Sequence, residues 1–119
     1  MKKSTPTFTL KSHFEGKELI VREIYDRLLK NLEKFGPLVA EPKKTSIHLI
    51  NVTALAGVMT RKNAIVLTIK SDRPLASARI HKSEQVSANR FHHELKLTSP
   101  GQVDEQLLAW LERAYALSA

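Results

Sequence analysis

The chain has 119 residues, the length of one domain, and its composition of 42% hydrophobic and 26% charged residues is ordinary for a soluble globular protein. Cysteine is absent, which excludes disulfide bonds and thiolate metal sites. The formal net charge is +7, so the chain is basic.

The first residues, MKKSTPTFTLKSHF, begin with lysines but contain no apolar run of the kind that a signal peptide needs. No other stretch approaches the roughly 20 apolar residues that cross a bilayer. We therefore expect a cytoplasmic protein that has no membrane partner. We expect one domain over residues 1–119, with residues 1–9 as a flexible lead-in.

The first periodic segment begins at Lys17. Its apolar residues are spaced by four, four, four and three positions, which predicts an amphipathic helix: Ile20, Ile24, Leu28, Leu32 and Phe35. Gly36 and Pro37 end this helix, because glycine accepts a left-handed cap conformation and proline cannot continue the hydrogen-bond ladder.

The middle of the chain alternates β-branched runs with short polar breaks, a pattern that predicts strands. The predicted strands are 44–50, 56–60, 64–70, 75–82 and 90–97. Residues 61–63 are expected to close a hairpin, and residues 71–74 form a turn by composition.

The last segment predicts a second helix. Ser99 can cap it, Pro100 suits its first turn, and Gln102 completes a capping box. Asp104 and Glu105 favour the positive end of the helix dipole. The predicted order is helix, about five strands, helix. It indicates an α+β fold in which a mainly antiparallel sheet carries both helices on one face.

Two adjacent histidines lie in the last predicted strand. Side chains of a strand alternate between its faces, so His93 joins Phe91 and Leu95 on the apolar face, whereas His92 joins Glu94 on the other. We expect His93 to be a structural, hydrogen-bonded residue. The split makes a metal site on this dipeptide geometrically poor, so we predict no metal. His92 and Glu94 could form a catalytic pair or a solvated ion pair.

The positive charge is concentrated in residues 43–96, where ten Lys or Arg residues face only Asp72, Glu84 and Glu94. Such asymmetry favours an anionic partner, although it also suits a surface that only keeps the protein soluble. If the strands are neighbours, the alternation places seven candidate anion-binding residues on one sheet face: Lys44, His48, Arg79, His81, Arg90, His92 and Lys96. Exposed aromatic residues for base stacking are scarce.

Three long segments, GPLVAEPKKTSIHLI, AGVMTRKNAIVLTIKSDRPL and EQVSANRFHHELKLTSPGQVDEQLLAWLERAY, carry a family resemblance. Over roughly residues 10–118 the chain resembles an uncharacterised bacterial family, the domain of unknown function 5655. Related domains are similar to segments found beside predicted nuclease or restriction components and in proteins labelled predicted transport proteins, which implies a leaning toward nucleic acid. By position, the resemblance implies these recurring polar residues: Lys43, Lys44, Thr45, Arg61, Lys62, Arg79, Asn89, Arg90, His92 and His93.

Three functions remain open from sequence. The leading hypothesis is a non-enzymatic module that binds nucleic acid or another polyanion through the basic sheet face. The second is a protein-interaction or accessory domain that uses its sheet face or edge, with a homodimer as one form. The third is an enzyme of unknown class. No catalytic residues and no cofactor are predicted, because no nucleophile, base and orienting residue can be assembled from the sequence.

Overall fold

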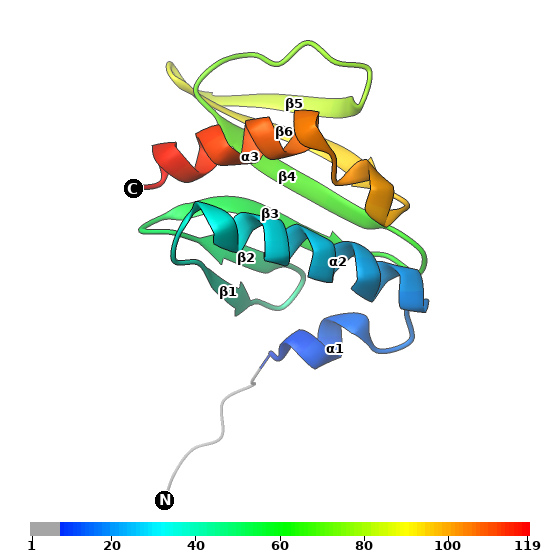
Figure 1. The fold of residues 1–119 in the computed structure, drawn as a ribbon. Coiled ribbons are helices and arrows are strands. Elements are labelled where there is room, and N and C mark those ends of the chain that lie inside the picture. The colour runs from blue at the N-terminus through cyan, green and yellow to red at the C-terminus, as the bar shows by residue number, and fades with distance from the viewer. Residues whose placement is uncertain (1–7) are drawn as a thin grey trace, which may run out of the picture.

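The computed structural model describes residues 8–119, which form three α-helices, two short 3-10 helices and a six-stranded sheet (Figure 1). The helices are α1 (Leu10–Phe14), α2 (Leu19–Leu32), η1 (Glu33–Phe35), η2 (Pro100–Gln102) and α3 (Glu105–Leu117). The strands are β1 (Val39–Pro42), β2 (Ile47–Ile50), β3 (Ala54–Thr60), β4 (Ile65–Ser71), β5 (Ile80–Ser87) and β6 (Arg90–Leu97).

The sheet is antiparallel throughout, in the order β1-β2-β3-β4-β6-β5. Helices α2 and α3 lie side by side on one of its faces (Figure 1). The predicted α+β fold with helices on one side is therefore confirmed, with six strands where about five were expected. The expected lead-in falls mainly on residues 1–7, which lie outside the described residues; Thr9 is described and caps α1 through Ser12.

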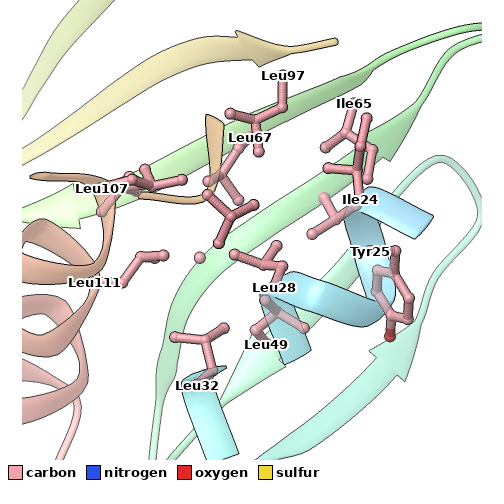
Figure 2. Close-up of a cluster of buried hydrophobic side chains, with 14 of the residues drawn as sticks. Ile24, Tyr25, Leu28, Leu32, Leu49, Ile65, Leu67, Leu97, Leu107 and Leu111 are labelled. Atoms are coloured by element: carbon pink, nitrogen blue, oxygen red, sulfur yellow. The ribbon is translucent and has the colours of Figure 1, made fainter. Parts of the chain in front are cut away.

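The core lies between the two long helices and the sheet (Figure 2). Leu28 and Leu32 of α2 and Leu111 of α3 are fully buried against Leu49 and Leu67 of the sheet, among others. These positions follow the predicted helical and strand periods, because burial on one face is what produces each period. Gly36 ends the first helical segment as predicted, with a φ of 146° that L side chains rarely adopt.

Three local predictions need correction. The strand predicted at 75–82 is wrong in its first half, because residues 72–79 form a loop and β5 starts at Ile80. Ala76 and Ala78, which the alternation of a strand over 75–82 would place on its apolar face, are exposed. The short elements α1 and β1 were not predicted at all. Asp104 caps the start of the second helix, α3, whereas the capping box of Ser99 and Gln102 lies at the start of η2.

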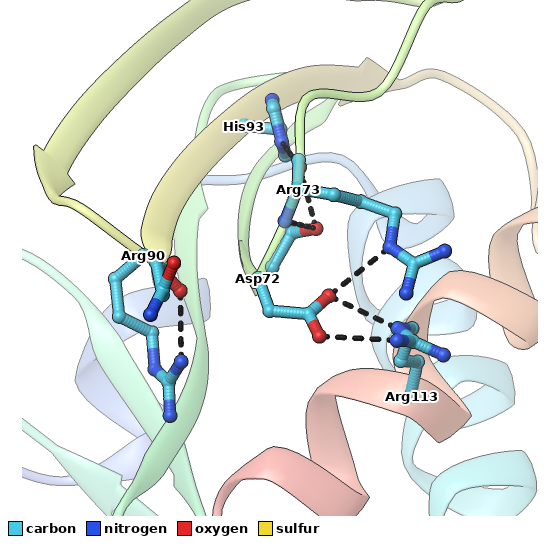
Figure 3. A network of polar contacts seen from close by, with 7 residues as sticks. Asp72, Arg73, Arg90, His93 and Arg113 are labelled. Carbon is cyan, nitrogen blue, oxygen red and sulfur yellow. Dashed lines mark hydrogen bonds and ion pairs between the residues drawn. The ribbon is translucent and has the colours of Figure 1, made fainter.

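Polar contacts hold the loop after β4 against α3 (Figure 3). The Asp72 carboxylate accepts hydrogen bonds from Nε and Nη2 of Arg113, each at 3.0 Å, and from Nε of Arg73 at 3.2 Å. These bonds, with that from Arg113 the strongest, lower the pKa of Asp72 from 3.8 to about 2. The loop is thereby fixed over the helix-covered face, where it supplies a partner to His93.

Candidate binding face

The sheet face opposite α2 and α3 carries no helix in the described part of the chain, and we call it the open face. The strand register places one residue from each strand in a row across it: Glu41, His48, Gly57, Thr68, Glu94 and Lys82. A second row contains Lys70, His92 and Glu84, and a third contains Met59, Val66 and Lys96. Residues that are distant in sequence therefore become neighbours.

A hollow of about 330 Å³ lies near the centre of the open face. Its floor includes Gly57 of β3, where a Cβ atom would meet no other atom within 4 Å. Around it stand His48 from β2, Thr68 and Lys70 from β4, and His92 from β6. The volume is at the lower end of the about 300–1,000 Å³ that is usual for small-molecule sites.

The rows of the open face contain Glu41, Glu84 and Glu94 as well as the lysines. Glu94 is bound by His81 of β5, whose Nε2 lies 2.9 Å from the Glu94 carboxylate. Four cations of this face take part in no ion pair within the described residues: Arg61, Lys70, Lys82 and Lys96. Residues 1–7 contain no acidic residue that could neutralise them.

The open face contains one pair of the acid-base type. Glu94 could orient the His81 imidazole, as a carboxylate does in an acid-base pair. However, in the part of the chain that the structure describes, no serine or threonine hydroxyl hydrogen-bonds to His48, His81 or His92. Within residues 8–119 no group of three or more metal-ligating side chains could hold a metal ion.

His93 lies on the opposite, helix-covered face, as predicted. It is only 1% exposed, and both ring nitrogens have partners. Nε2 lies 3.1 Å from the carbonyl of Arg73, which is drawn beside it in Figure 3, and Nδ1 lies 2.8 Å from the Ser83 hydroxyl. A carbonyl only accepts, so Nε2 carries the proton and, in the neutral ring, Ser83 donates to Nδ1. Its ring is also stacked on that of Phe91, with the two ring centroids 6.0 Å apart.

A family model matches residues 10–118, nearly the whole chain: Domain of unknown function (DUF5655). The chain belongs to this family. No significant match was found among the curated proteins or among the solved structures. The family assignment predicted from the three quoted segments is thereby confirmed. No helix in the described part of this DUF5655 chain is long and apolar enough to cross a membrane.

The predicted site residues of the DUF5655 chain divide into three groups. His48 and His92 line the hollow, while His81 and Lys96 lie beside it on the same face. Lys44 was predicted in a strand on the basic face, and this is wrong, because β2 starts at Ile47 and Lys44 lies exposed between β1 and β2. Arg90 is the exposed first residue of β6, and its guanidinium donates to the Asn89 carbonyl (Figure 3).

Arg79 is the exception, because its predicted position on the basic face is wrong. Its guanidinium donates to Asp104 at 2.8 Å, to the Gln102 carbonyl at 2.7 Å and to Gln106 at 3.2 Å, all at the start of α3. The residue lies just before β5 and ties this strand to the helix. Arg79 therefore stabilises the DUF5655 fold and does not contribute to the open face.

Three contributors to the open face were missed as site residues: Gly57, Lys70 and Lys82. A signal for Lys70 was present, because the alternation in 64–70 places it with Val66 and Thr68, opposite the buried Ile65, Leu67 and Ile69. Lys82 needed the true start of β5, and Gly57 needed the register that sets it between His48 and Thr68. Arg61 was noted only through the family resemblance.

Proposed function

We propose that this domain binds nucleic acid, through the open face of its sheet and without catalysing a reaction. The observation that supports this most directly is a set of three lysines on an uncovered sheet, Lys70, Lys82 and Lys96, which lie on three different strands and take part in no ion pair within the described residues. Phosphate contacts by lysine and arginine supply most of the affinity of such an interface. We keep the bacterial, cytoplasmic setting expected from sequence as part of this proposal.

A single strand suits the open face better than a duplex. A duplex is read by an element that enters a groove, such as a helix, and both long helices here lie on the other face. Single strands are bound on open sheets, where bases stack on aromatic or histidine rings and the backbone follows basic residues. His48 and His92 are the rings that line the hollow of the open face.

The test is binding to a fluorescein-labelled single-stranded oligonucleotide, measured by anisotropy at salt concentrations from about 50 to 200 mM. We expect affinity to fall steeply with salt. The double variant Lys70→Gln with Lys96→Gln should bind more weakly at every salt concentration and reduce the slope of log affinity against log salt by about one per lysine removed. Duplex DNA and heparin, measured in parallel, report whether another polyanion is preferred.

The matched control is Lys30→Gln with Lys34→Gln, which removes the same charge from exposed positions on the helix-covered side. We expect this control to bind almost as well as the parent chain. Equal losses in both double variants would mean that only net charge matters and that the open face is not the site. No binding by the parent chain at the low-salt end would overturn the proposed function.

One observation favours a second candidate, association through a sheet edge. The strand β5 is one of the two edge strands of the sheet in the described residues, and it is exposed along nearly its whole length. Register irregularities between Ile80 and Lys82 and between Gln85 and Ser87 interrupt it, which is a common protection against edge pairing. Sedimentation of the parent chain tests this candidate: a dimer that Gln85→Pro converts to a monomer would support it, and a monomeric parent chain would exclude it.

A further inference from the structure

We infer that the hollow over Gly57 is a subsite for one nucleotide unit, with a base in the hollow and phosphate at its rim. This inference rests on the proposed function, because it assigns the ligand chemistry of the same face. The unit can come from two sources, a nucleic-acid strand or a free mononucleotide, and the experiment below separates them.

The first support is the glycine itself. Glycine in the interior of a strand weakens the strand, and often marks a place where a ligand approaches the backbone. Gly57 does not have the positive φ of Gly16 and Gly36, so its backbone conformation does not require glycine. Its packing does not require glycine either, because an added Cβ would meet nothing within 4 Å. What the missing side chain provides is space on the open face.

The second support is the shape of this space. Gly57 pairs with His48 on one side and with Thr68 on the other, so the hollow lies between two strands that carry larger side chains. Met59 and Val66 give it an apolar wall from the adjacent row. A volume of about 330 Å³ with a flat floor of sheet accommodates a planar base.

The third support is the kind of group at the rim. His48 and His92 approach from β2 and β6, on opposite sides of β3 and β4, and imidazole rings stack on bases. Thr68 offers a hydroxyl to the edge of the base, and Glu94 has a second carboxylate oxygen beside the one that contacts His81. A carboxylate accepts hydrogen bonds from the exocyclic amine of a base.

The fourth support is the charge. Arg61 precedes β4 and Lys70 lies near its end, so the two cations border the hollow at opposite ends of one strand. A nucleotide within a nucleic-acid strand carries a phosphate on each side, which matches the cation at each end of β4. One carboxylate, Glu94, lines the hollow together with the two cations Arg61 and Lys70, so the rim favours an anionic ligand.

The experiment compares two oligonucleotides of equal length, one of deoxycytidine and one abasic, against the parent chain and the Gly57→Leu variant. Leucine fills the hollow without changing charge and meets no backbone or side-chain atom at Cβ. We expect the parent chain to bind the base-containing strand about 5- to 100-fold more tightly than the abasic one, as stacking of one base implies. In Gly57→Leu this preference should vanish, while affinity for the abasic strand stays unchanged.

A second variant, His92→Ala, tests stacking without filling the hollow. It should reduce the preference for bases and leave the melting temperature nearly unchanged, because His92 belongs to the open face and has no hydrogen-bonded partner in the described residues. If neither variant alters the preference, or if the parent chain binds both strands equally, the hollow is not a base subsite. Salt-dependent binding of the abasic strand would then leave the proposed function intact.

If neither strand binds, the proposed function fails, and cytidine 5′-monophosphate then tests whether the hollow alone binds a nucleotide. Shifts in the backbone amide resonances of Gly57 and Thr68 that inorganic phosphate does not reproduce, and that Gly57→Leu abolishes, would assign the hollow to a free nucleotide. The absence of such shifts, together with the absence of strand binding, would overturn the inference.

Discussion

The substitution His93→Ala tests how the last strand divides its two histidines. The ring is 1% exposed, and its removal breaks the hydrogen bonds to Ser83 and to the Arg73 carbonyl. Each bond contributes about 1 kcal/mol net, and the polar groups left without partners add a further cost. With the cavity left by the ring, we expect a loss of about 2–4 kcal/mol in the free energy of unfolding.

For a chain of 119 residues, this loss corresponds to a fall of about 8–16 °C in melting temperature, at about 4 °C per kcal/mol. Circular dichroism against temperature and urea measures both quantities. The neighbouring substitution His92→Ala is the matched control, because it removes the same ring from the open face, and it should cost less than about 0.5 kcal/mol. A loss below about 1 kcal/mol for His93→Ala, or equal losses for the two variants, would refute this account of the strand.

Three further predictions concern residues away from the open face. Arg79→Ala should lower the free energy of unfolding by about 1 kcal/mol, because α3 loses a partner at its start, and should leave oligonucleotide affinity unchanged. Urea unfolding and anisotropy measure the two quantities. A weaker affinity at unchanged stability would mean that Arg79 belongs to the binding site. Gly36→Ala should cost about 1–3 kcal/mol in urea unfolding, since its φ is 146° and its Cβ would lie 2.5 Å from the Tyr115 hydroxyl; Gly101→Ala, where a Cβ meets nothing within 4 Å, is the control and should unfold like the parent chain. Burial raises the pKa of Tyr25 from 10.0 to about 12, so its contribution to stability is complete below pH 10 and is lost as pH rises toward 12. Urea unfolding of Tyr25→Phe should therefore show less loss of stability than the parent chain between pH 10 and pH 12, and parallel curves would contradict the raised pKa.

The elements that the sequence predicted well are those with one buried face. The stripe through Ile24, Leu28 and Leu32 identified α2, and the alternation through Ile65, Leu67 and Ile69 identified β4. In both cases burial on one side imposes a period that can be read without the structure. The placement of His93 followed from the same rule.

The elements that the sequence did not predict correctly are those without a buried face. β5 is exposed along nearly its whole length, because it lies at the sheet edge, so KSEQVS shows no hydrophobic alternation. The alternation in LASARI was misleading, because Ala76 and Ala78 belong to an exposed loop. β1, with four residues ending at Pro42, is equally short of signal.

The candidate site was predictable only in part, because it depends on the order of the strands. Alternation within one strand was enough to assign His48 and His92 to outward positions. It could not show that β3 and β4 separate them, nor that Gly57 and Thr68 lie in the space between. The placement of Arg79 could not be predicted either, because its partners come from the start of α3, which is distant in sequence.

The distribution of ion pairs separates structural charges from those available to a ligand. Within residues 43–96, the cations that have carboxylate partners stabilise turns and helix contacts: Lys43, Arg73 and Arg79. On α2, Arg22 pairs with Asp26, whereas Lys30 takes part in no ion pair within the described residues. Ion pairing alone therefore does not distinguish the two faces. What distinguishes the open face is that Arg61 and Lys70 border a hollow there, and under the proposed function these are the cations that we expect the anion to contact.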